Sequence, residues 1–461
     1  MNIPRILLTA GASGSGKTLL TCGILQVLKD RGMKAASFKC GPDYIDPMFH
    51  TKVIGTKSRN LDAFFTEEKM LRYLFASNCR DMDIAVMEGV MGYYDGVGGT
   101  TTKASAYDLS RITQTPSVLI VNCKGMSVSV LPFIKGYMEY RKDSRIQGVI
   151  LNQLSPMLYA RMKKMVEEEL GILVLGYVPK VEDCVIESRH LGLVMPGEVE
   201  GFREKLKKLA GILEETLDVE AILKLAGSAP QIPEEKPWEA DSPFEYELPE
   251  KVRVGIARDE AFCFVYEDNL NLLTKMGAEL VFFSPVRDKS LSEGLDGLIF
   301  YGGYPELFGK ELEGNSSLRR EIKELYSRGI PVIAECGGFM YLHESLEDME
   351  GRHCAGVGII PGRAYKTEKL SRFGYVTLTP EKTCVFGRDI GQSPAHEFHY
   401  FDSDCCGKDF LAEKPMSSRH WECIHAAPNL LAGFPHFYYY GNPRLPQAFL
   451  GTCLEYKRKR R

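Results

Sequence analysis

A glycine-rich stretch near the N-terminus carries the residue types that hold nucleotide phosphates. Residues 11–18 read Gly-Ala-Ser-Gly-Ser-Gly-Lys-Thr and match the pattern G-x-x-x-x-G-K-[ST] at every fixed position. Glycines let the backbone curl so that several N–H groups point at one anion, and the N-terminus of a following helix adds partial positive charge. Lys17 would reach the outer phosphates, and the Thr18 hydroxyl would hold Mg²⁺. We therefore predict an ATP site that comprises Gly11, Ser13, Gly14, Ser15, Gly16, Lys17 and Thr18.

Acidic side chains follow two further segments of the same half. Asp43 and Asp46 come after an apolar run that ends at Gly-Pro, and Glu88 closes a second apolar run. Ligands of open α/β sheets bind beyond the carboxyl ends of strands, and carboxylates suit Mg²⁺. We predict a metal site of Thr18, Asp46 and Glu88, and acceptor activation by Asp43, Tyr44 and Asp95. The alternative for the aspartates is an Asx-turn with solvated acids.

Asn152 ends a third apolar run and is a candidate for binding the nucleotide base. A simple asparagine turn at that position is equally compatible with the sequence.

A cysteine in the second half has the surroundings of a nucleophile. Cys336 lies between the apolar run 332–335 and two glycines, where a strand is expected to turn sharply into a helix. The helix N-terminus should lower the pKa of this thiol, and the N–H that follows it should help to hold an oxyanion. We predict Gly337 and Gly303 as the oxyanion donors, the latter in a glycine-rich loop after another predicted strand.

A thiolate nucleophile needs a base, and seven histidines are available. They are His343, His353, His396, His399, His420, His425 and His436. His343 is expected on the same helix as Cys336, pointing away from it. The residue pattern alone ranks His436 and His396 about equal.

Composition narrows the class of protein. The chain has 461 residues, a formal net charge of −4 and 44% hydrophobic residues, which is typical of a soluble globular protein with two or three domains. This charge gives no indication of nucleic-acid binding, and no apolar run is long enough to cross a membrane. Thirteen cysteines without a framework pattern favour reduced thiols in the cytoplasm.

Both halves alternate strand and helix patterns, which predicts two doubly wound, mostly parallel-sheet α/β domains. The first has a P-loop NTPase fold. One amphipathic helix is expected over 198–225, and a proline-rich, acidic segment then marks a linker. We predict a phosphate-loop domain over 1–227, a linker over 228–250, a second domain over 251–455 and a basic tail over 456–461.

The ordered motifs resemble the cobyrinate a,c-diamide synthase family over nearly the whole chain. The matches are the phosphate loop, K-C-G-P-D-Y-I-D-P at 39–47, E-G-V-M-G at 88–92, R-H-L-G-L at 189–193, F-F-S-P at 282–285, G-G-Y-P-E at 302–306, A-E-C-G-G at 334–338 and H-E-F-H-Y at 396–400. The resemblance implies a dethiobiotin-synthetase-like ATPase half and a class I glutamine amidotransferase half. It also implies that Cys336 is the nucleophile and His436 its partner. Ordinary class I enzymes carry a glutamate two residues after this histidine, where Tyr438 stands, so a Cys–His dyad is expected.

The implied reaction converts the a- and c-acetates of cobyrinate into amides in the early-cobalt-insertion pathway to cobalamin. ATP and Mg²⁺ would form acyl phosphates, and glutamine would supply ammonia, with the two active sites facing each other. The partners implied are small molecules, with a homodimer as a further expectation. Alternatives are hydrogenobyrinate or Ni-sirohydrochlorin as acceptor, and, more distantly, a non-catalytic P-loop switch or scaffold. His190 is a further candidate for substrate contact.

Overall fold

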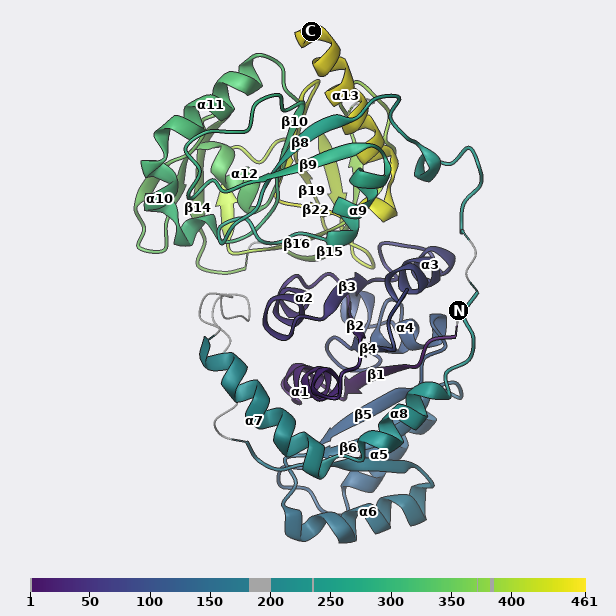
Figure 1. Cartoon of the computed structure of the whole chain (residues 1–461). Coiled ribbons are helices and arrows are strands. Elements are labelled where there is room, and N and C mark those ends of the chain that lie inside the picture. The colour runs from purple at the N-terminus through teal and green to yellow at the C-terminus, as the bar shows by residue number, and fades with distance from the viewer. Residues whose placement is uncertain (1, 182–199, 234–235, 371, 382–384) are drawn as a thin grey trace. The chain divides into compact units, whose positions relative to one another are not determined.

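A computed structural model describes the chain apart from residues 1, 182–199, 234–235, 371 and 382–384 (Figure 1). His190 therefore lies outside the described residues. The chain divides into two compact units, Met1–Pro237 and Trp238–Arg461. Each unit is described by itself below.

The first unit is built on one parallel sheet. Its described strands pair in the order β3-β2-β4-β1-β5-β6-β7, with every neighbouring pair parallel. The strands are β1 (Arg5–Ala10), β2 (Ala35–Cys40), β3 (Lys57–Leu61), β4 (Ile84–Glu88), β5 (Ser117–Asn122), β6 (Ile146–Asn152) and β7 (Leu173–Val178). The chain thus winds outward from β1 in both directions, which confirms the predicted doubly wound α/β class.

Helices connect and cover these strands. They are α1 (Lys17–Asp30), α2 (Ile45–Phe49), α3 (Glu68–Asn78), α4 (Ala106–Ile112), α5 (Val130–Glu139), α6 (Pro156–Leu170), α7 (Glu200–Thr216) and α8 (Val219–Gly227), with a π-helical turn at His50–Ile54 and a 3₁₀ turn at Val97–Gly99. Apolar side chains of α1, α7 and α8 share one core with β1, β4, β5, β6 and β7. The single helix expected over 198–225 is wrong: it breaks at Asp218, whose carboxylate accepts from Ala221 N–H and begins α8.

The second unit has a central sheet of mostly parallel strands. Its described order is β20-β21-β11-β10-β8-β9, with only β20 antiparallel to its neighbour. The strands are β8 (Val252–Ala257), β9 (Ala278–Phe283), β10 (Gly297–Phe300), β11 (Val332–Glu335), β20 (His425–Ala427) and β21 (Leu430–Gly433). The associated helices are α9 (Glu267–Lys275), α10 (Gly309–Gly314), α11 (Ser316–Ser327) and α12 (Gly337–Leu342), with 3₁₀ turns at Pro243–Glu245, Pro305–Leu307 and Tyr439–Gly441.

Two smaller sheets and a final helix complete the second unit. One sheet has the described order β13-β12-β14-β17 and the other β19-β18-β15-β16-β22. Their bounds are β12 (His343–Glu347), β13 (His353–Ala355), β14 (Ile360–Lys366), β15 (Arg372–Pro380), β16 (Ser393–His399), β17 (Phe401–Ser403), β18 (Phe410–Glu413), β19 (His420–Cys423) and β22 (His436–Phe437). His343 thus begins a strand, so its predicted place on the helix of Cys336 is wrong: that helix ends at Leu342.

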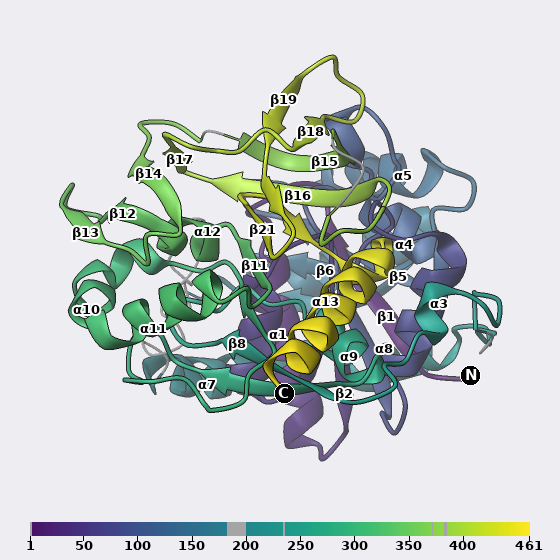
Figure 2. The ribbon, with the colours of Figure 1, turned by 90° about the horizontal axis from the view of Figure 1, so that it is seen from above.

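The basic C-terminal residues are part of a helix. Helix α13 (Arg444–Arg460) lies alongside β8 (Figure 2) and buries one apolar face. Arg460 donates to the Leu295 carbonyl (2.7 Å) and to the Asp296 carboxylate (2.9 Å). Residues 456–460 of the expected basic tail are therefore the end of α13.

Candidate functional site

The predicted phosphate loop joins β1 to α1. Gly14 and Gly16 adopt left-handed backbone angles, with φ of 75° and 91°. A Cβ at Gly16 would lie 2.6 Å from Asn152 Nδ2, so this close approach also requires glycine. Asn152 Nδ2 donates to the Ser15 carbonyl at 2.9 Å, and Gln153 N–H donates to its Oδ1 at 3.0 Å. The amide considered for base recognition therefore supports the loop in this structure.

Lys17 is folded back across the loop. Its Nζ donates to the Ala12 carbonyl at 2.9 Å and to the Met91 carbonyl at 2.6 Å. Burial, and then the Lys39 charge, lower its pKa to about 8. A phosphate oxygen in this loop would offer the ammonium group a charged acceptor in place of two neutral carbonyls.

A buried cluster of charges lies at the carboxyl ends of β2 and β4. Thr18 Oγ1 donates to Glu88 Oε1 at 2.6 Å, and Lys39 Nζ lies 2.8 Å from the same oxygen. Lys39 also forms an ion pair with Asp46. His50 Nε2 is 3.5 Å from Glu88 Oε2. The predicted metal-site residues Thr18, Asp46 and Glu88 are thus brought together around Lys39.

The ionisation of this cluster follows from burial and mutual charge. Burial, and then the Asp46 charge, raise the pKa of Glu88 to about 7. Burial would raise the pKa of Asp46 too, but the Lys39 ammonium and His50 hold it below its ordinary value. Asp46 and Glu88 in turn outweigh the effect of burial on Lys39 and raise its pKa. Asp46 and Lys39 are therefore held as a charged pair, whereas Glu88 takes up a proton readily until a further cation stabilises its carboxylate.

The oxygen donors present fit Mg²⁺ in part. A hydroxyl and two carboxylates are ligands that this cation prefers, and Glu88 Oε2 has no hydrogen-bond partner among the described residues. Within those residues, however, no group of three or more His, Cys, Asp or Glu forms a metal site by itself. Phosphate oxygens and water would have to complete the coordination.

The residues predicted to activate the acceptor do not form a cluster like that of Thr18, Asp46 and Glu88. Asp43 Oδ1 accepts from Ile45 N–H at 2.8 Å at the start of α2, and burial raises its pKa to about 6. Asp95 Oδ2 accepts from Gly92 N–H at 2.9 Å and closes a turn after β4. Tyr44 is buried immediately before α2. Both aspartates therefore stabilise local turns, whatever else they contact.

In the second unit, Cys336 lies on a strained turn between β11 and α12. Its φ of 48° and ψ of −109° are unfavourable for a residue with a Cβ. Cys336 N–H donates to the Gly433 carbonyl at 2.8 Å, and its own carbonyl accepts from Met340 N–H at 2.9 Å. The turn is thus held from both sides, and it places the thiol at the carboxyl end of the sheet.

The two predicted oxyanion donors lie beside this turn. Gly337 directly follows the nucleophile, and its N–H favours the thiolate form of Cys336. The nitrogen of Gly303 is 3.0 Å from the position that a Cβ of Gly337 would occupy, and Pro305 Cδ is 2.8 Å from it. Two backbone N–H groups near the nucleophile are the arrangement that acyl-transfer enzymes use to hold an oxyanion.

The structure places His436, rather than His396, next to the nucleophile. A Cβ at Gly302 would lie 2.5 Å from His436 Cε1 and 3.3 Å from Cys336 Cβ, so both side chains border that glycine. His396 stands opposite His436 across the β16–β22 pairing. Of the two histidines, the geometry therefore favours His436 as the candidate partner of the thiol.

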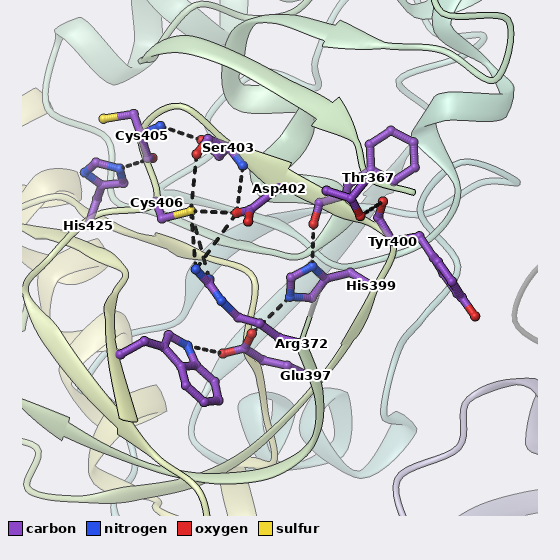
Figure 3. A network of polar contacts seen from close by, with 12 residues as sticks. Thr367, Arg372, Glu397, His399, Tyr400, Asp402, Ser403, Cys405, Cys406 and His425 are labelled. Atoms are coloured by element: carbon purple, nitrogen blue, oxygen red, sulfur yellow. Dashed lines mark hydrogen bonds and ion pairs between the residues drawn. The ribbon is translucent and has the colours of Figure 1, made fainter. Parts of the chain in front are cut away.

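Three further histidines of the second unit have partners elsewhere. His399 stacks on Phe434 with ring centroids 4.0 Å apart, and its Nε2 lies 3.0 Å from Glu397 Oε2 (Figure 3). His425 Nε2 is 2.8 Å from the Cys405 carbonyl, on the far side of the same network (Figure 3). His343 Nε2 lies 2.6 Å from Ser403 Oγ. These side chains hold strands together.

The expected lowering of the Cys336 pKa is wrong. Burial raises the pKa of this thiol above its ordinary value, the Glu306 charge adds to this, and the Gly337 N–H opposes it only in part. Burial also lowers the pKa of His436 well below its ordinary value, with His396 and His399 adding to the effect. The resting pair is therefore a neutral thiol beside a neutral imidazole.

Three residues of these sites were not singled out from the sequence. Lys39 and His50 contact Glu88 in the first unit, and Glu335 Oε2 lies 3.6 Å from His436 Nδ1 in the second. Glu335 is the last and Lys39 the penultimate residue of an otherwise uncharged strand, which is the signal that could have identified them. His50 carries no comparable signal.

Among the described residues, no helix is long and apolar enough to cross a membrane. All cysteines of the described part of the chain are free thiols.

Comparison with known proteins gives two family matches and a set of full-length relatives. Residues 6–193 match the CobQ/CobB/MinD/ParA nucleotide binding domain, and residues 253–437 match the CobB/CobQ-like glutamine amidotransferase domain. The chain is 39% identical over 459 residues to the cobyrinate a,c-diamide synthase of Caldanaerobacter subterraneus subsp. tengcongensis, covering 99% of this chain and 100% of the relative. It is 35% identical over 475 residues to the enzyme of that name from Priestia megaterium, covering 100% and 99%.

Proposed function

Because the chain belongs to the cobyrinate a,c-diamide synthase family, we propose that it amidates the a- and c-acetate carboxylates of cobyrinate. Family membership makes it a glutamine-dependent amidating ligase of cobalamin biosynthesis that uses ATP. It also argues against the non-catalytic switch or scaffold. The acceptor, the intermediates and the role of each residue belong to the proposal.

Activation of the acceptor is assigned to the first unit. A carboxylate is a poor acyl donor because hydroxide leaves badly. The acceptor carboxylate attacks the γ-phosphorus of ATP, ADP leaves, and an acyl phosphate results. Lys17 and the N–H groups of residues 11–18 bind the phosphates and stabilise the charge that develops on the transferred group. Thr18, Asp46 and Glu88 would hold Mg²⁺, which would neutralise phosphate charge.

Ammonia supply is assigned to the second unit. Cys336 Sγ attacks the carboxamide carbon of glutamine while its proton passes to His436. The Gly303 and Gly337 N–H groups hold the oxyanion that forms. Ammonia departs with the proton from His436, and water hydrolyses the thioester to glutamate. The released ammonia then displaces phosphate from the acyl phosphate, and the amide forms.

The observation that carries the proposal is the presence of both sites in one chain: Thr18 against Glu88 after a phosphate loop, and Cys336 on a strained turn beside His436. Neither site alone distinguishes an amidoligase from a simple NTPase or a simple glutaminase. Together they provide an activated carboxylate and a nitrogen nucleophile.

The test is to incubate the protein with ATP, Mg²⁺, glutamine and cobyrinate and to follow the product mass. Each conversion of an acid to an amide lowers the mass by about one unit, so two successive losses are expected. The same losses with hydrogenobyrinate or Ni-sirohydrochlorin, but none with cobyrinate, would support the amidation mechanism and show that the acceptor is a different tetrapyrrole. No loss with any tetrapyrrole would overturn the proposed reaction.

A further inference from the structure

Glu335 is a buried carboxylate directly before the nucleophile. It is the last residue of β11 and is only 1% exposed. Its Oε1 has no hydrogen-bond partner among the described residues. A buried carboxylate with unsatisfied acceptor capacity costs free energy, so its retention at this point needs a reason.

The carboxyl group is held against one particular nitrogen of His436. Glu335 Oε2 lies 3.6 Å from His436 Nδ1, and the Phe437 N–H beside it lowers the pKa of Glu335 against the larger effect of burial. This separation is longer than a hydrogen bond, but contacts of this kind tighten once substrate is bound. With Nδ1 facing Glu335, Nε2 is the ring nitrogen left for the thiol of Cys336.

Tyr438, two residues after His436, makes its hydrogen bond elsewhere and leaves Nδ1 of His436 to Glu335. The Tyr438 hydroxyl donates to Asp268 Oδ2 at 3.1 Å. The side chain at that position is therefore engaged with α9. A carboxylate reaches the histidine from the nucleophile's own strand instead.

Burial of the pocket means that a charged His436 needs a neighbouring carboxylate to stabilise it. Burial raises the pKa of Glu335 and lowers the pKa of His436, so either charge alone is unfavourable there. When Cys336 gives up its proton, His436 becomes an imidazolium in this low-dielectric pocket. An adjacent carboxylate makes the pair neutral overall, which offsets the cost of that charge.

We propose that Glu335 is the positioning residue of the glutaminase site: it accepts a hydrogen bond from His436 Nδ1–H and fixes the tautomer whose Nε2 takes the Cys336 proton. The thiol proton moves to Nε2, the Nδ1 proton stays between His436 and Glu335, and the Nε2 proton leaves with ammonia. The dyad expected from the sequence is thereby a three-residue relay. This inference rests on the proposed roles of Cys336 and His436.

The test compares Glu335→Gln with the parent enzyme, using glutamine and ammonium chloride as alternative nitrogen sources. We expect kcat with glutamine to fall about 10²- to 10⁴-fold, the range set by loss of an orienting carboxylate. KM for glutamine and the rate with ammonium should stay within about threefold of the parent. Glu335→Asp, which keeps the charge, should recover part of the loss.

Asp296→Asn is the matched control for burial. Asp296 is a fully buried carboxylate at the opposite, amino end of β10, where it accepts from Arg253 N–H at 2.9 Å. This variant should lose thermal stability but keep kcat with glutamine. A Glu335→Gln enzyme that keeps kcat with glutamine within about threefold, or loses ammonium-dependent synthesis to the same extent, would overturn the inference.

A second readout separates positioning from packing. The rate at which iodoacetamide alkylates Cys336 depends on thiolate formation, which His436 assists. The pH dependence of this rate should shift in Glu335→Gln and not in Asp296→Asn. An unchanged profile would count against the inference. If Cys336→Ser itself retains glutamine-dependent synthesis, the proposed function fails rather than the role of Glu335.

Discussion

The two units place their reactive groups at the same kind of location and prepare them in opposite ways. In each, the groups lie beyond the carboxyl ends of parallel strands, at β1, β2 and β4 in the first unit and at β10 and β11 in the second. The first site is crowded with charge: Lys17, Lys39, Asp46 and Glu88 lie within one network. The second centres on a thiol and an imidazole that burial keeps neutral.

The difference follows from the chemistry assigned to each site. Phosphoryl transfer involves charge throughout, so a site for it must hold fixed charges before the ligand arrives. Acyl transfer from a neutral amide develops charge only during the reaction. A site for this reaction therefore needs only a neutral nucleophile that the backbone holds in place and N–H donors already oriented toward the oxyanion.

The sharpest way to break this comparison is Cys336→Ser. A serine hydroxyl in the same buried turn is a much poorer nucleophile, so we expect glutamine-dependent amide formation to fall about 10³-fold or more. Synthesis from ammonium chloride should remain, because the charged site of the first unit is untouched. Product mass with each nitrogen source measures both rates. Loss of both activities would contradict the division of labour between the units.

Lys17→Ala tests the charged site. Removing the ammonium group from the phosphate loop should lower the rate with glutamine and with ammonium alike, by about 10²- to 10³-fold. Lys34→Ala, at an exposed lysine before β2, is the matched control and should leave both rates unchanged. Release of ADP in the presence of the acceptor provides the measurement. Equal rates in the parent and Lys17→Ala would remove Lys17 from the proposed mechanism.

Gly302→Ala tests whether backbone position alone governs the neutral site. The added Cβ would lie 2.5 Å from His436 Cε1, so the imidazole must move. A displacement of this size typically costs about 10²-fold in rate. Gly314→Ala, where a Cβ meets nothing within 4 Å, is the control. We expect glutamine-dependent synthesis to fall only in the first variant, and ammonium-dependent synthesis to fall in neither.

The sequence predicted best those elements whose signal is local. The strand expected over 332–335 is confirmed residue for residue as β11, because it is a short run bounded by a proline and by the turn at Cys336. Strand β3 was missed because its sequence, Lys-Ser-Arg-Asn-Leu, is mostly polar, as an edge strand permits. Helix α13 was missed because its basic last turn dominates the composition of the C-terminus.

The site residues, too, could be predicted where the signal is local and not where it depends on the fold. Residues within a contiguous motif, such as Lys17, Thr18 and Cys336, are identified by spacing. The contacts of Lys39 with Glu88 and of Glu335 with His436 depend on strand order and on the register of β22, which no local pattern contains. The preference for His436 over His396 had to come from resemblance for the same reason. The Cys336 pKa was misjudged because burial, a property of the whole unit, outweighs the local helix N-terminus.

Asp218→Ala changes a residue outside both sites and is expected to have the smallest effect of these variants, a modest loss of stability with no change in either rate. The Asp218 carboxylate accepts from Ala221 N–H at 2.9 Å and caps α8, whose apolar face belongs to the core of the first unit. Its loss should lower the free energy of unfolding by about 1 kcal/mol. Asp218→Asn, which retains a capping oxygen, should cost less, and chemical denaturation of the three proteins compares them. Because neither site is touched, both nitrogen sources should give parent rates at temperatures where the variant is folded. A selective loss of ammonium-dependent synthesis would instead mean that the charged site depends on the packing of α8 against the sheet.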